Sequence, residues 1–287
     1  MPNPPLLVLG ATSLVGAPLL ARLAQAGRPA VALSRADRAP AKALTWIRGD
    51  LGEPGWNDSL PPVEQALSLS PIWLLPQALP ALADAGVRRL VAFSSTSRFT
   101  KAASPVAAER EVAERLARSE EETVALCEAR GVAWTILRPT LIYDPGRDAN
   151  VTRLARLIRK VGVLPLAGRG GGRRQPVHAD DLAAGALAAL DASAARNRAY
   201  DLPGGETLTY RAMAERIFEG LGRRPRILSV PAPLWRAAFA LASPVLPGAT
   251  AAMGDRMAED LVFDGEPARR DFGWSPRPFR PEFPNLL

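Results

Sequence analysis

The stretch Pro5–Leu20, PLLVLGATSLVGAPLL, constrains the fold of this chain more than any other segment. Leu6–Leu9 is a short apolar run of the kind that forms a strand buried on both faces. Gly10–Gly16 predicts a tight turn, and the Ala- and Leu-rich residues after it predict a helix to about Ala26. Gly27 is placed to end that helix. The stretch is therefore predicted to form a strand–turn–helix unit.

A strand that runs through a glycine-spaced turn into a helix is the phosphate-binding unit of dinucleotide-binding folds. Gly10 permits the turn, Gly16 lets the helix pack closely on the strand, and the helix N-terminus offers unpaired N–H groups to a pyrophosphate. Ser13 replaces the middle glycine of the usual spacing and can donate a hydrogen bond to a phosphate oxygen. The alternative is a turn that uses glycine for steric reasons alone. The predicted cofactor contacts in this turn are Gly10, Thr12, Ser13, Leu14, Val15 and Gly16.

Two further predicted strands, Pro29–Ser34 and Ala43–Arg48, end where the adenosine of a dinucleotide lies. An acidic residue after the second strand binds a free ribose 2′-hydroxyl, whereas an arginine accommodates a 2′-phosphate. Arg35 follows that strand and favours NADP(H) over NAD(H); the alternative is a solvated arginine paired with Asp37. Asp50 is predicted to accept a hydrogen bond from the adenine amine or to cap its turn. The predicted contacts here are Ser34, Arg35, Asp50 and Leu51.

The next segments alternate between strand and helix patterns. Val63–Ser70 and Arg88–Ser95 are predicted strands on either side of the helix Trp73–Ala85, and Ala133–Leu137 is a strand that follows the helix Ala107–Ala129. This order predicts an α/β protein with a doubly wound parallel sheet, a Rossmann fold. The last helix alternates Glu and Arg, and the simplest interpretation is a solvated face with i,i+4 ion pairs.

Polar residues gather directly after the strand Arg88–Ser95. Ligands of open α/β sheets bind at the carboxyl ends of the strands, so hydroxyl groups here are candidate site residues. The alternative is that Ser and Thr are simply common in strand-to-helix connections. The residues concerned are Ser94, Ser95, Thr96, Ser97 and Arg98.

The 287 residues are 47% apolar and 23% charged, which suits a globular chain with a sizeable core. The net charge of +7 comes almost wholly from arginine. Because the arginines are spread along the chain, we interpret them as compositional bias and expect no nucleic-acid partner. The sequence shows no leader and no membrane span, and a single cysteine, Cys127, suits the cytoplasm. One Cys and one His predict no metal site.

Together, these segments resemble the short-chain dehydrogenase/reductase superfamily, and specifically its extended and atypical branch typified by NAD-dependent epimerase/dehydratases. The resemblance implies a Rossmann domain over residues 1–148, to which 176–200 returns, and a small C-terminal α/β substrate lobe over 149–175 and 201–287. The motifs that carry it are GATSLVG (Gly10–Gly16), GDL (Gly49–Leu51), FSST (Phe93–Thr96), WTILRPTLIYDPG (Trp134–Gly146), RQPVHADDLA (Arg174–Ala183), YDLPGGETLTYRAM (Tyr200–Met213) and ARRDFGWSP (Ala268–Pro276).

The resemblance also implies roles for single residues. Thr96 matches the Ser/Thr that hydrogen-bonds the reacting oxygen, and Tyr143 lies in a segment that lines the nicotinamide side of the cleft. Arg174 matches an arginine that holds substrate phosphates in nucleotide-sugar epimerases. The predicted catalytic residues are Thr96, Tyr143 and Lys101; Ser94 and Pro139 are predicted cofactor contacts, and Arg98 and Arg174 are predicted substrate contacts.

Two departures from the family pattern affect the chemistry. The family uses Tyr-x-x-x-Lys, in which the tyrosine moves the proton, but the expected positions here fall near Ala113 and Ala117. Leu141 stands where nucleotide-sugar enzymes carry an asparagine, which argues against a nucleotide-sugar substrate. Lys101 and Tyr143 are alternative proton donors, unless Lys101 is only a surface residue and Tyr143 only packs the strand end.

The second lobe has fewer signals. A basic helix, Asn150–Val161, precedes the Gly/Arg loop Gly168–Arg174, which either closes over an anionic ligand or is simply flexible. Pro231–Ala251 is apolar and is predicted to pack on the lobe's core; the alternative is a wall for a lipophilic substrate or a docking face. His178 is predicted to make a structural hydrogen bond, with Asp180 or Asp181 capping the next helix.

These observations favour a cytoplasmic NADP(H)-binding oxidoreductase that acts on a carbonyl or alcohol of unknown identity. The rival hypothesis is a protein that binds the cofactor without chemistry, as a redox sensor or as a structural or assembly subunit of a larger complex. A homodimer or a protein partner is compatible with either.

Overall fold

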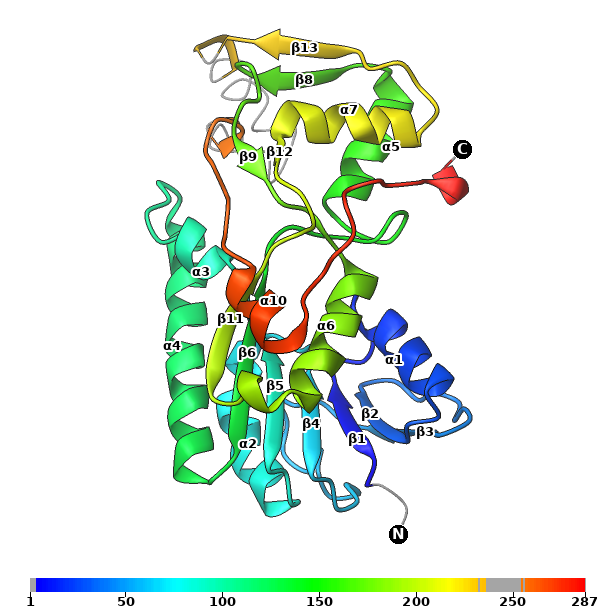
Figure 1. The fold of residues 1–287 in the computed structure, drawn as a ribbon, viewed down its shortest axis with the longest axis vertical. Coiled ribbons are helices and arrows are strands. Elements are labelled where there is room, and N and C mark those ends of the chain that lie inside the picture. Colours follow the sequence, from blue (N-terminus) through cyan, green and yellow to red (C-terminus); the bar gives the residue numbers. More distant parts are fainter. Residues whose placement is uncertain (1–3, 232, 236–253, 255, 287) are drawn as a thin grey trace. The chain divides into compact units, whose positions relative to one another are not determined.

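The computed structural model describes residues 4–231, 233–235, 254 and 256–286 (Figure 1). The chain divides into two compact units, each built from three separate segments. Unit 1 comprises residues 1–139, 179–202 and 264–275, and unit 2 comprises residues 140–178, 203–263 and 276–287. The division places residues 140–148 in unit 2 and residues 264–275 in unit 1, whereas the sequence assigned each stretch to the other part.

Unit 1 contains a seven-stranded sheet in the order β11-β6-β5-β4-β1-β2-β3, and every neighbouring pair is parallel. The predicted doubly wound sheet is therefore confirmed, with its strand order reversing between β1 and β4. The strands are β1 (Leu6–Leu9), β2 (Ala30–Ser34), β3 (Leu44–Arg48), β4 (Gln65–Ser68), β5 (Arg89–Phe93), β6 (Ala133–Pro139) and β11 (Arg198–Leu202).

Helices cover both faces of this sheet. The helices α2 and α4 pack together on one face, and α1 and α6 pack together on the other (Figure 1). All residues of β1, β2 and β5 are buried, as their apolar runs predict. The helices of unit 1 are α1 (Gly16–Gln25), α2 (Leu75–Asp84), α3 (Ser97–Thr100), α4 (Ala107–Ala129), α6 (Ala179–Asp191) and α10 (Glu266–Phe272), with short 3₁₀ turns at Ile72–Leu74 and Ser193–Ala195.

Two strands, β4 and β5, end earlier than the sequence predicts, whereas β6 continues two residues further, to Pro139. In β4 the ladder stops at Ser68, and the following Leu69 and Ser70 line a cavity. In β5 the ladder stops at Phe93, because Ser94 and the residues after it turn into α3. The residues that leave each ladder are the ones available to a ligand.

Unit 2 is built from short paired strands and two helices. The strands pair as β7 with β10, β9 with β12, and β8 with β13, and α5 packs against α7. Of the apolar stretch Pro231–Ala251, residues 232 and 236–251 lie outside the described residues, so that prediction stays open. The elements are β7 (Ile142–Tyr143), α5 (Val151–Val161), β8 (Leu164–Ala167), β9 (Arg173–Arg174), β10 (Val177–His178), β12 (Leu208–Thr209), α7 (Tyr210–Gly220) and β13 (Ile227–Val230), with a 3₁₀ turn at Pro284–Leu286.

Within the described ranges, no helix combines the length and the apolar character needed to cross a membrane.

The lone cysteine gives a direct test of the core. Cys127 is fully buried in α4, and burial raises the pKa of its thiol from 9.0 to about 12. The folded chain therefore keeps this proton where the unfolded chain loses it, so this group lowers stability as the pH rises from 9 towards 12. We expect negligible labelling of Cys127 by an aromatic disulfide reagent at pH 8 and stoichiometric labelling in urea. Rapid labelling of the folded protein would contradict the burial.

Candidate functional site

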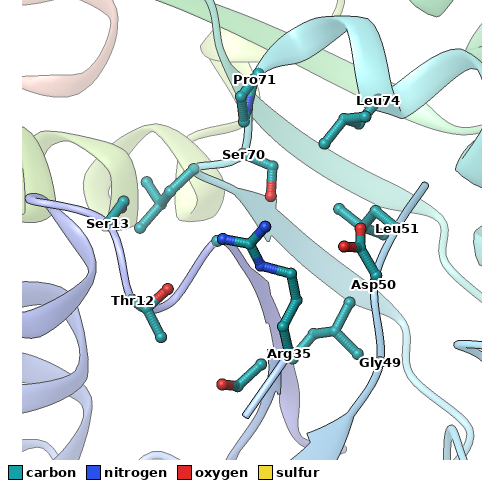
Figure 2. Close-up of a pocket in the computed structure, with 13 residues that line it drawn as sticks. Thr12, Ser13, Arg35, Gly49, Asp50, Leu51, Ser70, Pro71 and Leu74 are labelled. Carbon is teal, nitrogen blue, oxygen red and sulfur yellow. The ribbon is translucent and has the colours of Figure 1, made fainter. Parts of the chain in front are cut away.

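A cavity of about 300 Å³ lies at the carboxyl ends of β1, β2, β3 and β4 (Figure 2). Each of these strands contributes the residues that follow it, so the cavity straddles the point where the strand order reverses. This is the place where open α/β sheets bind their ligands. The lining residues are Gly10, Thr12, Ser13, Leu33, Ser34, Arg35, Gly49, Asp50, Leu51, Leu69, Ser70, Pro71 and Leu74.

The glycine turn is sterically required. Gly10 has a φ of +70°, and a Cβ there would lie 2.5 Å from the backbone nitrogen of Ser70. A Cβ on Gly16 would lie 2.0 Å from the carbonyl oxygen of Ala11. Both contacts are with backbone atoms, which cannot move away cheaply. The predicted steric roles are therefore confirmed: Gly10 permits the turn, and Gly16 permits the close approach of the helix.

The turn also offers donors to an anion. The hydroxyl of Ser13 is buried and has no hydrogen-bond partner among the described residues. The helix α1 begins at Gly16, no side chain caps its N-terminus, and its first turn holds no acidic residue. An unsatisfied hydroxyl beside an uncapped helix N-terminus fits a phosphate group, which would satisfy both. The residues present thus suit the pyrophosphate of a dinucleotide.

Arg35 extends into this cavity between Thr12 and Asp50 (Figure 2). The neighbouring Ser34 hydroxyl accepts hydrogen bonds from the Ala36 N–H (3.2 Å) and from Nε of Arg38 (3.3 Å). This arrangement places a guanidinium, and no carboxylate, directly after β2 on the cavity wall.

Asp50 caps its turn, as one of its two predicted roles requires, while the adenine contact stays a prediction. Its Oδ1 accepts a hydrogen bond from the Gly52 N–H at 3.0 Å, which caps the turn, and the residue also lines the cavity. A second cavity of about 440 Å³ shares Arg35, Gly49 and Asp50 with the first and continues to Trp56. The two cavities therefore adjoin each other near the carboxyl end of β3.

The second group of predicted residues lies at the ends of β5 and β6. Thr96 is 6% exposed; its hydroxyl donates to the carbonyl oxygen of Pro139 at 3.1 Å, and its N–H donates to the same oxygen at 3.2 Å. Lys101 ends α3 directly after this segment. The structure thus brings Ser94, Thr96, Arg98 and Pro139 to one corner of the sheet.

The prediction that the charged residues of α4 form a solvated face is wrong at Glu120. Glu120 is only 2% exposed, and its carboxylate accepts hydrogen bonds from Ser94 Oγ (2.5 Å) and from Arg98 Nη1 (2.6 Å). Arg138 on β6 adds a donor from Nη2 at 2.6 Å. This residue was missed, although its spacing could have revealed it. Glu120 shares the 3-4-3-4 spacing of the buried stripe on α4, Ala113, Leu116, Glu120, Thr123 and Cys127.

A second carboxylate lies next to this cluster. Asp201 on β11 is 3.7 Å from Nη1 of Arg138. Burial raises the pKa of Asp201, and the positive charge of Arg138 opposes that shift. Arg138 is therefore held between Glu120 and Asp201, at the corner that carries Thr96.

The helix α4 carries no substitute for the missing tyrosine and lysine. Ala113 is buried and Ala117 is half-buried, and neither side chain can transfer a proton. The usual positions on α4 therefore supply no proton donor.

Two of the predicted site residues belong to unit 2 and are buried there. The Tyr143 ring is 1% exposed and makes edge-on contacts with the rings of His178 and Phe279, at centroid distances of 5.0 Å and 4.8 Å. Arg174 is 5% exposed and donates to the carbonyl oxygens of Arg173 (2.8 Å), Glu259 (2.6 Å) and Arg256. Burial lowers the pKa of Arg174. The proton-donor role of Tyr143 and the phosphate-binding role of Arg174 stay predictions.

The predicted cap of α6 has a different geometry. Because α6 begins at Ala179, Asp180 and Asp181 lie within its first turn, where negative charge stabilises the helix. Asp180 accepts a two-pronged hydrogen bond from Arg22 on α1, at 2.8 Å and 2.9 Å. The described residues contain no group of three or more side chains able to hold a metal ion.

Comparison with known proteins agrees with this geometry. The model of the NAD dependent epimerase/dehydratase family matches residues 76–202. A 2-alkyl-3-oxoalkanoate reductase of Stenotrophomonas maltophilia is 29% identical in an alignment of length 218 that covers 67% of this chain and 65% of that protein. The mitochondrial NADH dehydrogenase [ubiquinone] 1 alpha subcomplex subunit 9 of Arabidopsis thaliana is 34% identical over 105 residues, 36% of this chain and 26% of that protein. The chain thus spans about two thirds of the length of the reductase and about a quarter of the length of the NADH dehydrogenase subunit.

Solved structures extend the likeness to the whole fold. The structure of MoeE5 in complex with UDP-glucose and NAD matches with a TM-score of 0.74 at 20% identity, covering 96% of this chain and 94% of that one. At this level of identity the likeness shows a shared fold, the Rossmann fold with a smaller second unit. The resemblance seen in the sequence is confirmed: residues 76–202 match the NAD dependent epimerase/dehydratase family model, and the similar proteins include reductases and epimerases.

Proposed function

We propose that this protein binds NADP(H) in preference to NAD(H) and uses it to reduce a carbonyl group or to oxidise the corresponding alcohol. The observation that supports the cofactor preference is Arg35, which extends into the cavity directly after β2. A guanidinium at this position pairs well with a 2′-phosphate, and a carboxylate would repel it. Asp37, the nearest acidic residue in sequence, pairs with Arg48 at 3.2 Å.

The reaction is proposed at the corner formed by Ser94, Thr96 and Pro139. Bound NADPH supplies a hydride from C4 of its nicotinamide. The Thr96 hydroxyl, which donates to the Pro139 carbonyl here, turns to donate to the substrate oxygen. Because α4 lacks the usual tyrosine, we propose that Lys101, half-buried in the same unit, gives the proton to that oxygen. A reductase among the relatives supports this reaction class.

A titration with the two cofactors tests the preference. We expect Arg35→Ala to weaken NADPH binding roughly tenfold to a hundredfold, the range expected for loss of a charge-assisted hydrogen bond, and to leave NADH binding unchanged. The measurement is nicotinamide fluorescence with each cofactor. Arg48→Ala is the matched control, because its side chain is 70% exposed and lines the second cavity but not the first.

Three results would decide between the hypotheses. Equal affinity of the wild type for both cofactors would contradict the preference. Absence of binding by either cofactor would contradict the whole proposal. Tight NADPH binding without turnover of a broad carbonyl panel would favour the rival hypothesis of a non-catalytic redox sensor or assembly subunit.

A further inference from the structure

The net positive charge of the chain is carried entirely by unit 2. Unit 2 contains 17 Lys and Arg residues against 9 Asp and Glu, a net charge of +8, whereas unit 1 contains 19 against 20, a net charge of −1. The arginine excess therefore does not follow the even spread that the sequence analysis assumed. A charge asymmetry of this size between two parts of one chain is typical of a surface that binds an anionic partner.

Five cations of unit 2 lie near the C-terminal end of α5. Its eleven residues include no acidic side chain, and Arg159 and Lys160 lie in its last turn. Arg223, which follows α7, donates from Nη1 to the carbonyl oxygens of Ile158 (3.2 Å) and Arg159 (3.1 Å), so the turn after α7 lies against this end of α5. We name this surface the basic edge; it consists of Arg159, Lys160, Arg223, Arg224 and Arg226.

No ion pair joins any residue of the basic edge to a carboxylate within the described part of the chain, and all five are exposed. Other arginines of unit 2 do have such partners, for example Arg147 with Asp144, and Arg173 with Asp260. The nearby Glu219 on α7 is exposed and is the one acidic residue of the adjoining helix end. The edge is thus a local excess of charge that the carboxylates of the described residues do not neutralise.

Helix stability explains only part of this cluster. Arg159 and Lys160 are favourable at a helix C-terminus, and Arg223 satisfies carbonyl oxygens there. Arg224 and Arg226 lie beyond both helices, in the connection between α7 and β13, and have no such role. Their presence points to a partner outside the chain.

Exposed aliphatic side chains flank the same edge. Val161 is 55% exposed, Leu228 is 57% exposed, and Leu157, one turn earlier on α5, is 40% exposed. The segments 157–163 and 222–230 contain no aromatic residue. Single-stranded nucleic-acid sites combine cations with aromatic stacking platforms, whereas interfacial membrane sites combine cations with aliphatic side chains that enter the headgroup region.

We propose that the basic edge, with Val161 and Leu228, is a docking surface for an anionic phospholipid membrane. The cations attract the negatively charged headgroups, and the two aliphatic side chains enter the boundary between headgroups and acyl chains. This binding is peripheral and reversible. It does not depend on the proposed cofactor or reaction.

Co-sedimentation with vesicles tests the proposal. The full-length protein is expected to sediment with vesicles of equal parts phosphatidylcholine and phosphatidylglycerol, to stay in solution with phosphatidylcholine alone, and to be released by high salt. The double variant Lys160→Glu/Arg224→Glu is expected to lose at least about tenfold in partition coefficient, since each basic residue near such a surface contributes several-fold. Both residues are exposed, and neither side chain has an ion pair among the described residues.

Matched variants separate this surface from net charge alone. Arg118→Glu/Arg196→Glu changes the charge equally on exposed positions of unit 1 and is expected to bind as the wild type does. Val161→Ser/Leu228→Ser is expected to weaken binding while leaving its salt dependence. NADPH affinity, measured on every variant, reports separately on the proposed function.

The proposal is overturned if anionic and zwitterionic vesicles bind alike, or if both charge-reversal variants lose binding equally. Binding of a fluorescent RNA or DNA oligonucleotide that displaces the protein from anionic vesicles at lower concentration would also overturn it, in favour of a nucleic-acid partner.

Discussion

Gly16→Ala is expected to abolish dinucleotide binding and to lower the free energy of unfolding by several kcal/mol. The added Cβ would lie 2.0 Å from the carbonyl oxygen and 2.5 Å from the carbonyl carbon of Ala11, both of them backbone atoms. The start of α1 would have to move away from β1, which displaces Ser13 and the helix N-terminus that face the cavity. Overpacking in a tightly packed region costs about 1–3 kcal/mol, and a backbone clash costs more.

Gly27→Ala is the matched control at the other end of the same helix. Nothing lies within 4 Å of a Cβ there, although its φ of +62° makes the substitution strained. We expect it to cost about 1 kcal/mol and to leave NADPH affinity unchanged. Urea unfolding and cofactor fluorescence measure both variants. Similar effects of the two substitutions on binding would contradict a steric role specific to Gly16.

Glu120→Ala has the second large expected effect. Removing the carboxylate leaves Arg98 and Arg138, whose side chains are 23% and 16% exposed, without their shortest ion pairs. Leaving buried charges uncompensated costs roughly 3–5 kcal/mol, and the partial exposure of both arginines places the expected loss near the lower end. Ser94 also loses its acceptor, so the segment that carries Thr96 is expected to become less ordered.

Glu121→Ala supplies the comparison for that variant. Glu121 is the next residue on α4, its side chain is 71% exposed, and it lies 3.4 Å from Arg98. Exposed pairs contribute little, so we expect a change within about 0.5 kcal/mol. Urea midpoints measure both, and hydrogen exchange of the Ser94–Lys101 segment shows whether its order changes. If both variants unfold at the same urea concentration, the buried cluster does not stabilise the protein.

The regular elements of unit 1 could be predicted from the sequence because they obey simple periodicities. The helix Ala107–Ala129 has the predicted bounds, and the strand Leu6–Leu9 and its turn follow from apolar run and glycine spacing. The ends of β4 and β5 could not be placed, because apolar and hydroxyl residues continue past the last ladder hydrogen bond. Both strands end because the chain beyond them turns away from the sheet, along the cavity after β4 and into α3 after β5.

Glu120 shows why the candidate site was predicted only in part. Ser94, Thr96 and Arg98 follow a strand, so their place at the carboxyl edge could be inferred from sequence order. Glu120 comes from a helix rich in charged residues, and which of its glutamates is buried depends on Arg98 and Arg138, contributed by other elements. The unequal charge of the two units could not be predicted from the sequence either, because each unit is assembled from three separate segments of the chain.

The interleaving of those segments affects how the protein is made. Trp274 is 4% exposed in unit 1, and a Cβ on Gly185 of α6 would lie 2.4 Å from its ring, so residues 264–275 complete the packing around that helix. The ribosome must therefore synthesise the chain as far as residue 275 before unit 1 can close. Until then β11 and α6 are present without α10, and the surface of α6 that Trp274 covers stays exposed. A transcript or expression clone that ends before residue 275 would yield an incomplete dinucleotide-binding unit rather than a smaller functional one.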